Sequence, residues 1–158
     1  MLLYHGSNIA VMNPKIIPAN RALDFGYGFY LTSDYEQAVK WAKITFLRRD
    51  SGTPTVSVYD FDECDAGLSV LTFPCANADW LNFVTANRSG KAVNNDYDVI
   101  IGPVANDNTM PVINLYLSGA YSEDEALRRL LTQKLKDQYT IKTETGLKCL
   151  KLTEVIEL

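Results

Sequence analysis

The sequence has few of the residues from which metal and redox sites are built. It contains one histidine and three cysteines, without a Cys-x-x-Cys pair. A structural zinc site needs about four Cys or His ligands at close spacings, so we expect no metal centre. Cys64, Cys75 and Cys149 are odd in number, and we interpret them as reduced thiols of a cytoplasmic protein.

Long apolar runs and an excess of positive charge are also absent. No segment approaches the roughly 20 apolar residues of a membrane span, and residues 1–20 lack the pattern of a signal peptide, so we expect no membrane contact. The net charge of −4 argues against a broad nucleic-acid surface. A length of 158 residues, 47% of them hydrophobic, predicts a single domain over residues 1–158.

The predicted strands and helices do not alternate regularly, which favours an α+β fold over a doubly wound one. Ser33-x-x-Glu36 has the form of a capping box and predicts a helix to Arg48. Ser122-x-x-Glu125 predicts a second helix, to about residue 136. The remaining predicted elements are a helix at 79–88 and strands at 1–6, 28–32, 55–61, 97–101, 138–143 and 148–157.

Two short segments near the N-terminus hold the candidate binding residues. His5 ends the first predicted strand and is followed by Gly6 and Ser7. Residues 25–31 read Phe-Gly-Tyr-Gly-Phe-Tyr-Leu, where the glycines permit a tight bend before the strand that carries Tyr30. A His-Gly on one strand and a tyrosine on its neighbour can line a slot for a flat ligand.

These segments resemble the first two motifs of ADP-ribosyltransferases of the diphtheria-toxin and poly(ADP-ribose) polymerase branch. The second motif of that branch runs Phe-Gly-x-Gly-Ile-Tyr-Phe, and Trp41, eleven residues after Tyr30, matches its second aromatic. Nearly the whole chain is also similar to a bacterial family, domain of unknown function 3990, including residues 80–84, 97–105 and 138–144. The resemblance implies an ADP-ribosyltransferase-like fold, with two small antiparallel or mixed β-sheets and a few helices around an NAD cleft.

The same resemblance implies NAD as the substrate and assigns roles to individual residues. Tyr30 and Trp41 would sandwich the nicotinamide, each stack adding about 0.5–1.5 kcal/mol beyond burial. The backbone of Gly6 would hydrogen-bond the carboxamide, and His5 would donate to a ribose hydroxyl. The implied catalytic residues are His5, Tyr30 and Gln138, and the implied NAD-binding residues are His5, Gly6, Ser7, Tyr30, Leu31, Ala38 and Trp41.

Gln138 stands where the family has a glutamate that stabilises the cation left by bond cleavage. A neutral amide there predicts a loss of about 1–2 kcal/mol, or roughly 10–30-fold in rate, and argues against chain elongation. Glu144 is an alternative carboxylate if the strand continues, although at that spacing it lies roughly 20 Å away. Arg88 is a candidate for the pyrophosphate, but we favour a solvated arginine at a helix end.

The expected function is transfer of one ADP-ribose from NAD to a protein or nucleic-acid acceptor. The resemblance adds a toxin-like role with a neutralising antitoxin partner. NAD glycohydrolysis uses the same residues, and a catalytically silent NAD-binding or protein-interaction module is an alternative of another class, motivated by Gln138. An RNA 2′-phosphotransferase shares the fold, but the acidic composition disfavours it. His5, Tyr30 and Trp41 also have plain structural interpretations, as a strand-end histidine and ordinary core aromatics.

Overall fold

The computed structural model describes residues 1–17, 23–62, 67–91 and 96–158, so Cys64 lies outside the described residues. The strands in the described ranges are β1 (Leu2–Ser7), β2 (Phe29–Leu31), β3 (Thr55–Phe61), β4 (Val70–Thr72), β5 (Val99–Pro103), β6 (Asp137–Ile141) and β7 (Leu150–Glu157). The helices are α1 (Tyr35–Arg49), α2 (Ala78–Arg88), α3 (Met110–Leu117), α4 (Glu123–Leu130) and α5 (Glu144–Leu147).

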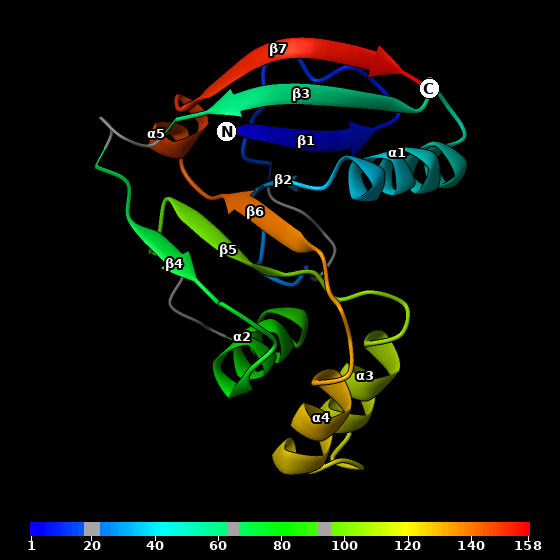
Figure 1. Cartoon of the computed structure of the whole chain (residues 1–158), viewed down its shortest axis with the longest axis vertical. Coiled ribbons are helices and arrows are strands. Elements are labelled where there is room, and N and C mark those ends of the chain that lie inside the picture. Colours follow the sequence, from blue (N-terminus) through cyan, green and yellow to red (C-terminus); the bar gives the residue numbers. More distant parts are fainter. Residues whose placement is uncertain (18–22, 63–66, 92–95) are drawn as a thin grey trace.

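The strands form two small sheets, one above the other in Figure 1. The first has the order β1-β3-β7 and is antiparallel throughout. The second has the order β2-β6-β5-β4, and only its β4–β5 pair is parallel. An isolated antiparallel bridge between Tyr4 and Thr32 connects β1 to the end of β2. The expected α+β architecture with two small sheets is therefore confirmed.

Three hydrophobic clusters hold these layers together. One lies between the sheets and contains Leu3, Phe29, Leu31, Tyr59, Phe61, Val99, Ile141 and Leu147. A second joins the lower sheet to α2, α3 and α4 and contains Phe25, Phe73, Trp80, Leu81, Val84, Ile100, Ile113, Ala126 and Leu130. The third, Ala38, Ala42, Val56 and Val58, packs α1 against the upper sheet. Each sheet is thus packed against its own helices. The two sheets are connected through β2, which pairs with β6 of the lower sheet and is followed by the bridge from Thr32 to β1 of the upper sheet.

Gly6 permits a close contact between β1 and α1. A Cβ at this position would stand 1.9 Å from the carbonyl oxygen of Ala38 and 2.7 Å from the backbone nitrogen of Ala42. Both atoms belong to a helix backbone and cannot move aside as a flexible side chain can. Only glycine therefore lets α1 lie directly against this strand.

Several predicted boundaries are wrong. The α1 N-cap is Asp34, whose carboxylate accepts from Gln37 N at 2.8 Å, whereas Ser33 donates to Asp137 across the sheet. The helix predicted to reach residue 136 ends at Leu130, and β5 continues through Gly102 and Pro103 because both pair with β6. Sequence patterns also missed β4, α3 and α5. Among the described residues, no helix has the length and apolar character needed to cross a membrane.

Candidate functional site

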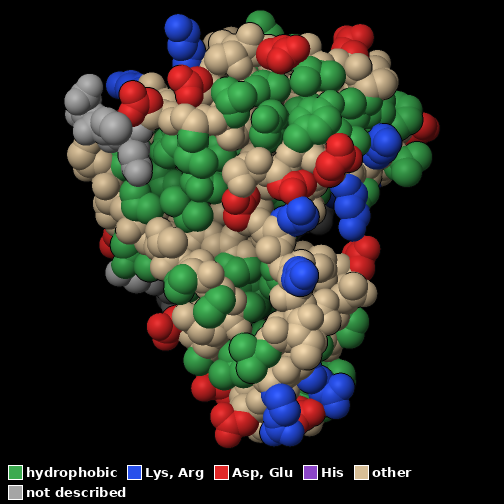
Figure 2. Space-filling model, in the orientation of Figure 1, with side chains coloured by type: hydrophobic (Ala, Val, Ile, Leu, Met, Phe, Trp, Pro, Cys, Tyr) green, Lys and Arg blue, Asp and Glu red, His purple; other side chains and the backbone are tan. Residues whose placement is uncertain are grey.

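A cavity of about 440 Å³ opens where β1 and β2 separate. This volume lies within the range of roughly 300–1,000 Å³ that is typical of small-molecule sites. On the face shown in Figure 2, the molecule is hollowed between its upper and lower parts, and both basic and acidic side chains lie around the hollow. The cavity is lined by His5, Gly6, Leu23, Asp24, Tyr30, Trp41, Ile44, Thr45, Arg48, Arg49, Arg88, Val104, Ala105 and Gln138.

The backbone of Gly6 presents an open strand edge to this cavity. Phe61 N donates to Met1 O on the β3 side of β1, so the odd-numbered residues of β1 bond β3. The backbone N–H and C=O of Tyr4 point away from β3 and exchange two hydrogen bonds with the backbone of Thr32, at 2.8 and 3.0 Å. By the alternation of an antiparallel strand, the N–H and C=O of Gly6 also face away from β3. The bridge with β2 ends at Tyr4, which leaves a donor and an acceptor at the cavity wall.

His5 is held in one orientation by the neighbouring strand. Its Nδ1 lies 2.7 Å from the carbonyl oxygen of Tyr30, and because a carbonyl only accepts, Nδ1 carries the hydrogen. The ring stacks on Phe29 with a centroid distance of 4.3 Å. Burial lowers the pKa of His5 below its ordinary value of 6.5, and the nearby Arg49 lowers it further. A neutral ring leaves Nε2 as an acceptor, so a ligand hydroxyl would donate to His5, whereas we expected His5 to be the donor.

Tyr30 contributes a ring whose hydroxyl is already engaged. The hydroxyl donates to Gly26 O at 2.5 Å and accepts from Phe25 N at 3.0 Å. Burial raises the pKa of Tyr30 above its ordinary value of 10, and the charge of Asp24 raises it further. The phenol therefore stays protonated and serves as a wall of the cavity rather than as an acid or base.

The bend before β2 depends on Gly26 and on hydrogen bonds from Lys142, which we call the lysine clamp. Gly26 has a φ of +75°, in the left-handed region that favours glycine. Lys142 Nζ donates to the carbonyls of Phe25 and Tyr27, both at 2.6 Å, and lies 5.2 Å from the Tyr27 ring centroid. Burial lowers the pKa of Lys142 to about 8. The clamp fixes the segment that carries the cavity residues 24 and 30.

One face of α1 forms the opposite wall. Trp41, Ile44, Thr45 and Arg48 line the cavity and are spaced at i, i+3, i+4 and i+7, which places them on one side of a helix. Arg49, in the last turn, also reaches the cavity and donates to the side chain of Asn8 at 3.1 Å. This wall supplies one large ring and two positive charges.

A buried polar cluster closes the inner end of the cavity. Asp24, with 4% of its side chain exposed, lies 2.5 Å from Arg88 Nη2 and accepts from Arg88 Nε at 2.7 Å. Gln138, only 2% exposed, donates through Nε2 to Asp24 Oδ2 at 3.0 Å and to Pro103 O at 3.1 Å. Arg88 is therefore not the solvated helix-end residue that we favoured, because it is paired with a buried carboxylate.

The remaining predicted site residues lie outside the cavity lining. Ser7 is buried beside Asn8, and Leu31 belongs to the core between the sheets. Ala38 faces Gly6 through its backbone. Glu144 is exposed at the start of α5, because β6 ends at Ile141 and the chain turns into a helix, so the assumed strand does not reach it. The structure brings together His5, Gly6, Tyr30, Trp41, Arg88 and Gln138.

The sequence reasoning missed Asp24, Arg48 and Arg49. Asp24 directly precedes the Phe25-Gly26 motif, so the sequence could predict that it lies near Tyr30. Its contact with Gln138 could not be predicted in this way, because the two residues are 114 positions apart. Arg48 follows from the helical period that begins at Trp41. Within the described ranges, no three or more His, Cys, Asp or Glu side chains are placed to hold a metal ion.

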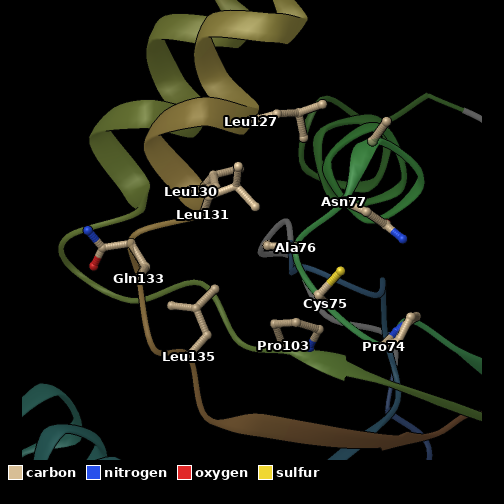
Figure 3. Close-up of a pocket in the computed structure, with 11 residues that line it drawn as sticks. Pro74, Cys75, Ala76, Asn77, Pro103, Leu127, Leu130, Leu131, Gln133 and Leu135 are labelled. Atoms are coloured by element: carbon tan, nitrogen blue, oxygen red, sulfur yellow. The ribbon is translucent and has the colours of Figure 1, made fainter.

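A second cavity of about 450 Å³ is lined in part by Pro103 and by residues of α4. Figure 3 shows leucines of α4 on one side and the segment that contains Cys75 on the other. Cys75 is an exposed free thiol, whereas Cys149 is half-buried and its Sγ donates to Thr145 O. The lining is mainly aliphatic, whereas the cavity between β1 and β2 joins a histidine, a carboxylate, an amide and three arginines. Because ligand sites combine an apolar wall with a few convergent polar groups, the latter is the candidate site.

Comparison with known proteins places the chain in one family. The family described as "Protein of unknown function (DUF3990)" matches residues 1–152. No match was found among curated proteins or among solved structures. Because the match covers nearly the whole sequence, the protein belongs to the DUF3990 family.

Proposed function

We propose that the protein cleaves NAD and transfers a single ADP-ribose to a macromolecular acceptor. The observation that carries the proposal is the convergence, in one cavity, of the Gly6 backbone edge, His5, the rings of Tyr30 and Trp41, and Gln138. The Gly6 edge and the two rings match the nicotinamide, and His5 and Gln138 match the ribose attached to it.

The nicotinamide fits the outer part of this arrangement. Its carboxamide carries a donor and an acceptor, which are the complement of the C=O and N–H that Gly6 turns away from β3. The rings of Tyr30 and Trp41 line the same space, and flat aromatic ligands bind well against such rings. The pyridinium ring is positively charged, which strengthens its attraction to their faces.

The ribose fits between His5 and Gln138. His5 Nε2 is an acceptor for one ribose hydroxyl, and the carbonyl of Gln138 is an acceptor for another. When the bond from C1′ to the nicotinamide nitrogen breaks, its electron pair neutralises the pyridinium and nicotinamide leaves. The sugar becomes an oxocarbenium-like cation, which the acceptor's nucleophile attacks at C1′ with loss of a proton.

The arginines suit the remaining part of NAD. Arg48, Arg49 and Arg88 all line the cavity, and a guanidinium pairs with phosphate oxygens through two parallel hydrogen bonds. Asp24 holds one of these groups, Arg88, in place. A pyrophosphate placed here would join the ribose beside Gln138 to the adenosine half of NAD.

The test uses NAD labelled in its adenylate half, with purified protein and a bacterial extract as the source of acceptors. Label recovered in macromolecules, and lost in the His5→Ala, Tyr30→Ala double variant, supports transfer. Lys43→Ala is the control, because Lys43 is an exposed residue of α1 outside the cavity lining. Free labelled ADP-ribose alone indicates glycohydrolysis instead, and saturable NAD binding without cleavage indicates a silent binding module.

The toxin-like role is also part of the proposal. Expression of the wild-type chain in a bacterial host should arrest growth if transfer modifies an essential macromolecule. The double variant should leave growth unaffected at the same protein level. An antitoxin partner would then be found as a protein whose co-expression restores growth, and growth arrest by the double variant would contradict a role for NAD chemistry.

A further inference from the structure

The hydrogen bond between Asp24 and Gln138 decides which way the amide of Gln138 points. Nε2 donates to Asp24 Oδ2 at 3.0 Å and to Pro103 O at 3.1 Å. A carboxylate and a backbone carbonyl accept only, so both N–H groups are used on this side. The carbonyl oxygen Oε1 is consequently turned the other way.

Oε1 then faces the cavity. No donor among the described residues bonds it, and within those residues the only buried side-chain atom without a partner is Thr140 Oγ1. Oε1 is therefore neither satisfied by the protein nor sealed away from the cavity that Gln138 lines. It is an acceptor aimed at the space where a ribose hydroxyl would lie.

Asp24 is itself fixed by several donors. Arg88 donates to Oδ1 through Nε at 2.7 Å, and the backbone N–H of Ala105 donates to Oδ2 at 3.1 Å. Asn87 donates to the backbone carbonyl of Asp24 at 3.2 Å. A carboxylate held in this way cannot rotate away from Gln138, and charge-assisted hydrogen bonds polarise the groups they join.

The same arrangement explains why an amide occupies position 138. A glutamate in the same rotamer would bring a second carboxylate oxygen to about the distance now spanned by Nε2, 3.0 Å from Asp24 Oδ2 and 3.1 Å from Pro103 O. Two buried carboxylates at that distance repel each other, and one must take up a proton. Glutamine turns both contacts into hydrogen bonds.

We propose that Asp24 is the positioning residue of Gln138. It fixes the amide so that Oε1 accepts a hydrogen bond from the ribose. It also supplies, on the Nε2 side of the amide, the negative charge that glutamine lacks. This inference rests on the proposed function. In this arrangement the carboxylate charge of the site is carried by residue 24 instead of residue 138, and the two side chains act together. Replacing Gln138 by glutamate, the residue of the ADP-ribosyltransferases that the chain resembles, should therefore lower the activity rather than raise it.

The test is a double-mutant cycle of Asp24→Asn, Gln138→Glu and their combination, with Glu154→Gln on exposed β7 as the control. Each single variant should lower kcat for nicotinamide release by about 10–100-fold, the range of a charge-assisted hydrogen bond, with KM for NAD nearly unchanged. In the double variant the new amide at position 24 can donate to the new carboxylate at position 138, so kcat should recover at least about tenfold over either single variant. Recovery is partial, because the N–H of Ala105 then faces a donor.

A thermal unfolding cycle without NAD gives a second readout. Gln138→Glu should lower Tm near neutral pH, and the added Asp24→Asn should restore part of it. If Asp24→Asn does not fold, Gln138→Glu alone still decides, because activity equal to or above wild type would overturn the inference. Strictly additive effects on kcat would also overturn it. Absence of nicotinamide release by the wild type would instead overturn the proposed function, and the inference with it.

Discussion

The hydrogen bond from His5 Nδ1 to the carbonyl of Tyr30, at 2.7 Å, ties the two strands together at the point where they begin to separate. It fixes the hydrogen on Nδ1 and leaves Nε2 as the free nitrogen of a neutral ring. It also uses a β2 carbonyl that faces β1. A residue that lines the cavity thus holds β1 and β2 together at the cavity's edge.

Burial of neutral His5 predicts a stability that depends on pH. Because the folded pKa is lowered below 6.5, the unfolded chain binds the proton first as the pH falls. The contribution of His5 to the free energy of unfolding should be constant above about pH 6.5 and should decrease below that pH.

Denaturant unfolding between pH 5 and pH 8 checks this prediction. His5→Gln has no titrating ring, so the difference between wild type and variant isolates His5 from other groups. Asp34 and Asp98, whose pKa values are lowered by their hydrogen bonds, contribute equally to both proteins. Parallel stability curves for the two proteins would contradict a neutral, buried His5.

Gly6→Ala should separate α1 from β1. The added Cβ would meet the carbonyl of Ala38 at 1.9 Å, and because a helix backbone cannot move aside, the loss should reach the upper end of the range for overpacking, about 3 kcal/mol or more. Urea unfolding measures this loss. Gly90→Ala is the matched control, because Gly90 has a φ of +72° and a Cβ there meets nothing within 4 Å. It should cost only about 1–2 kcal/mol for its backbone conformation, and an equal or smaller loss for Gly6→Ala would refute the close approach.

Trp41→Ala should lower the affinity for NAD. Trp41 is half-buried on the cavity face of α1, and loss of one aromatic stack corresponds to about 2–13-fold in affinity. Trp41→Phe should keep most of that affinity because it keeps a ring. Calorimetric titration with NAD measures both variants. Equal affinities for the alanine variant and wild type would place the nicotinamide elsewhere.

Asp34→Ala should destabilise α1 by about 0.5–2 kcal/mol, as loss of an N-cap does. Its carboxylate accepts from Gln37 N and also pairs with Lys136 at 2.6 Å. Glu36→Ala should have little effect, because the helix begins one residue later than the capping box Ser33-x-x-Glu36 requires. Unfolding curves of both variants distinguish the two caps, and a larger loss for Glu36→Ala would favour the box.

Local sequence signals predicted much of this fold. Strand β3 and the boundaries of α2 follow from β-branched runs and helical periodicity over a few residues. The errors lie where tertiary contacts override local signals. Ser33 resembles an N-cap but is bound by Asp137 from β6, and Gly102-Pro103 resembles a strand end but pairs with Gln138 and its neighbour.

The candidate site was only partly visible for the same reason. His5, Tyr30 and Trp41 belong to motifs with fixed spacing, so they could be found in the chain. Asp24 acquires its meaning only from Gln138 and Arg88, which lie on β6 and α2. No local pattern signals such a contact, so the sequence alone offers Glu144 as the alternative carboxylate.

The most direct test of the account is nicotinamide release from NAD by the purified protein, measured beside the His5→Ala, Tyr30→Ala double variant. The account predicts release by the wild type and its loss in a variant whose folding is verified by its unfolding curve. Equal release by both proteins would show that the cavity between β1 and β2 is not the site. No release by the wild type, with NAD and acceptor extract in excess, would contradict NAD cleavage itself.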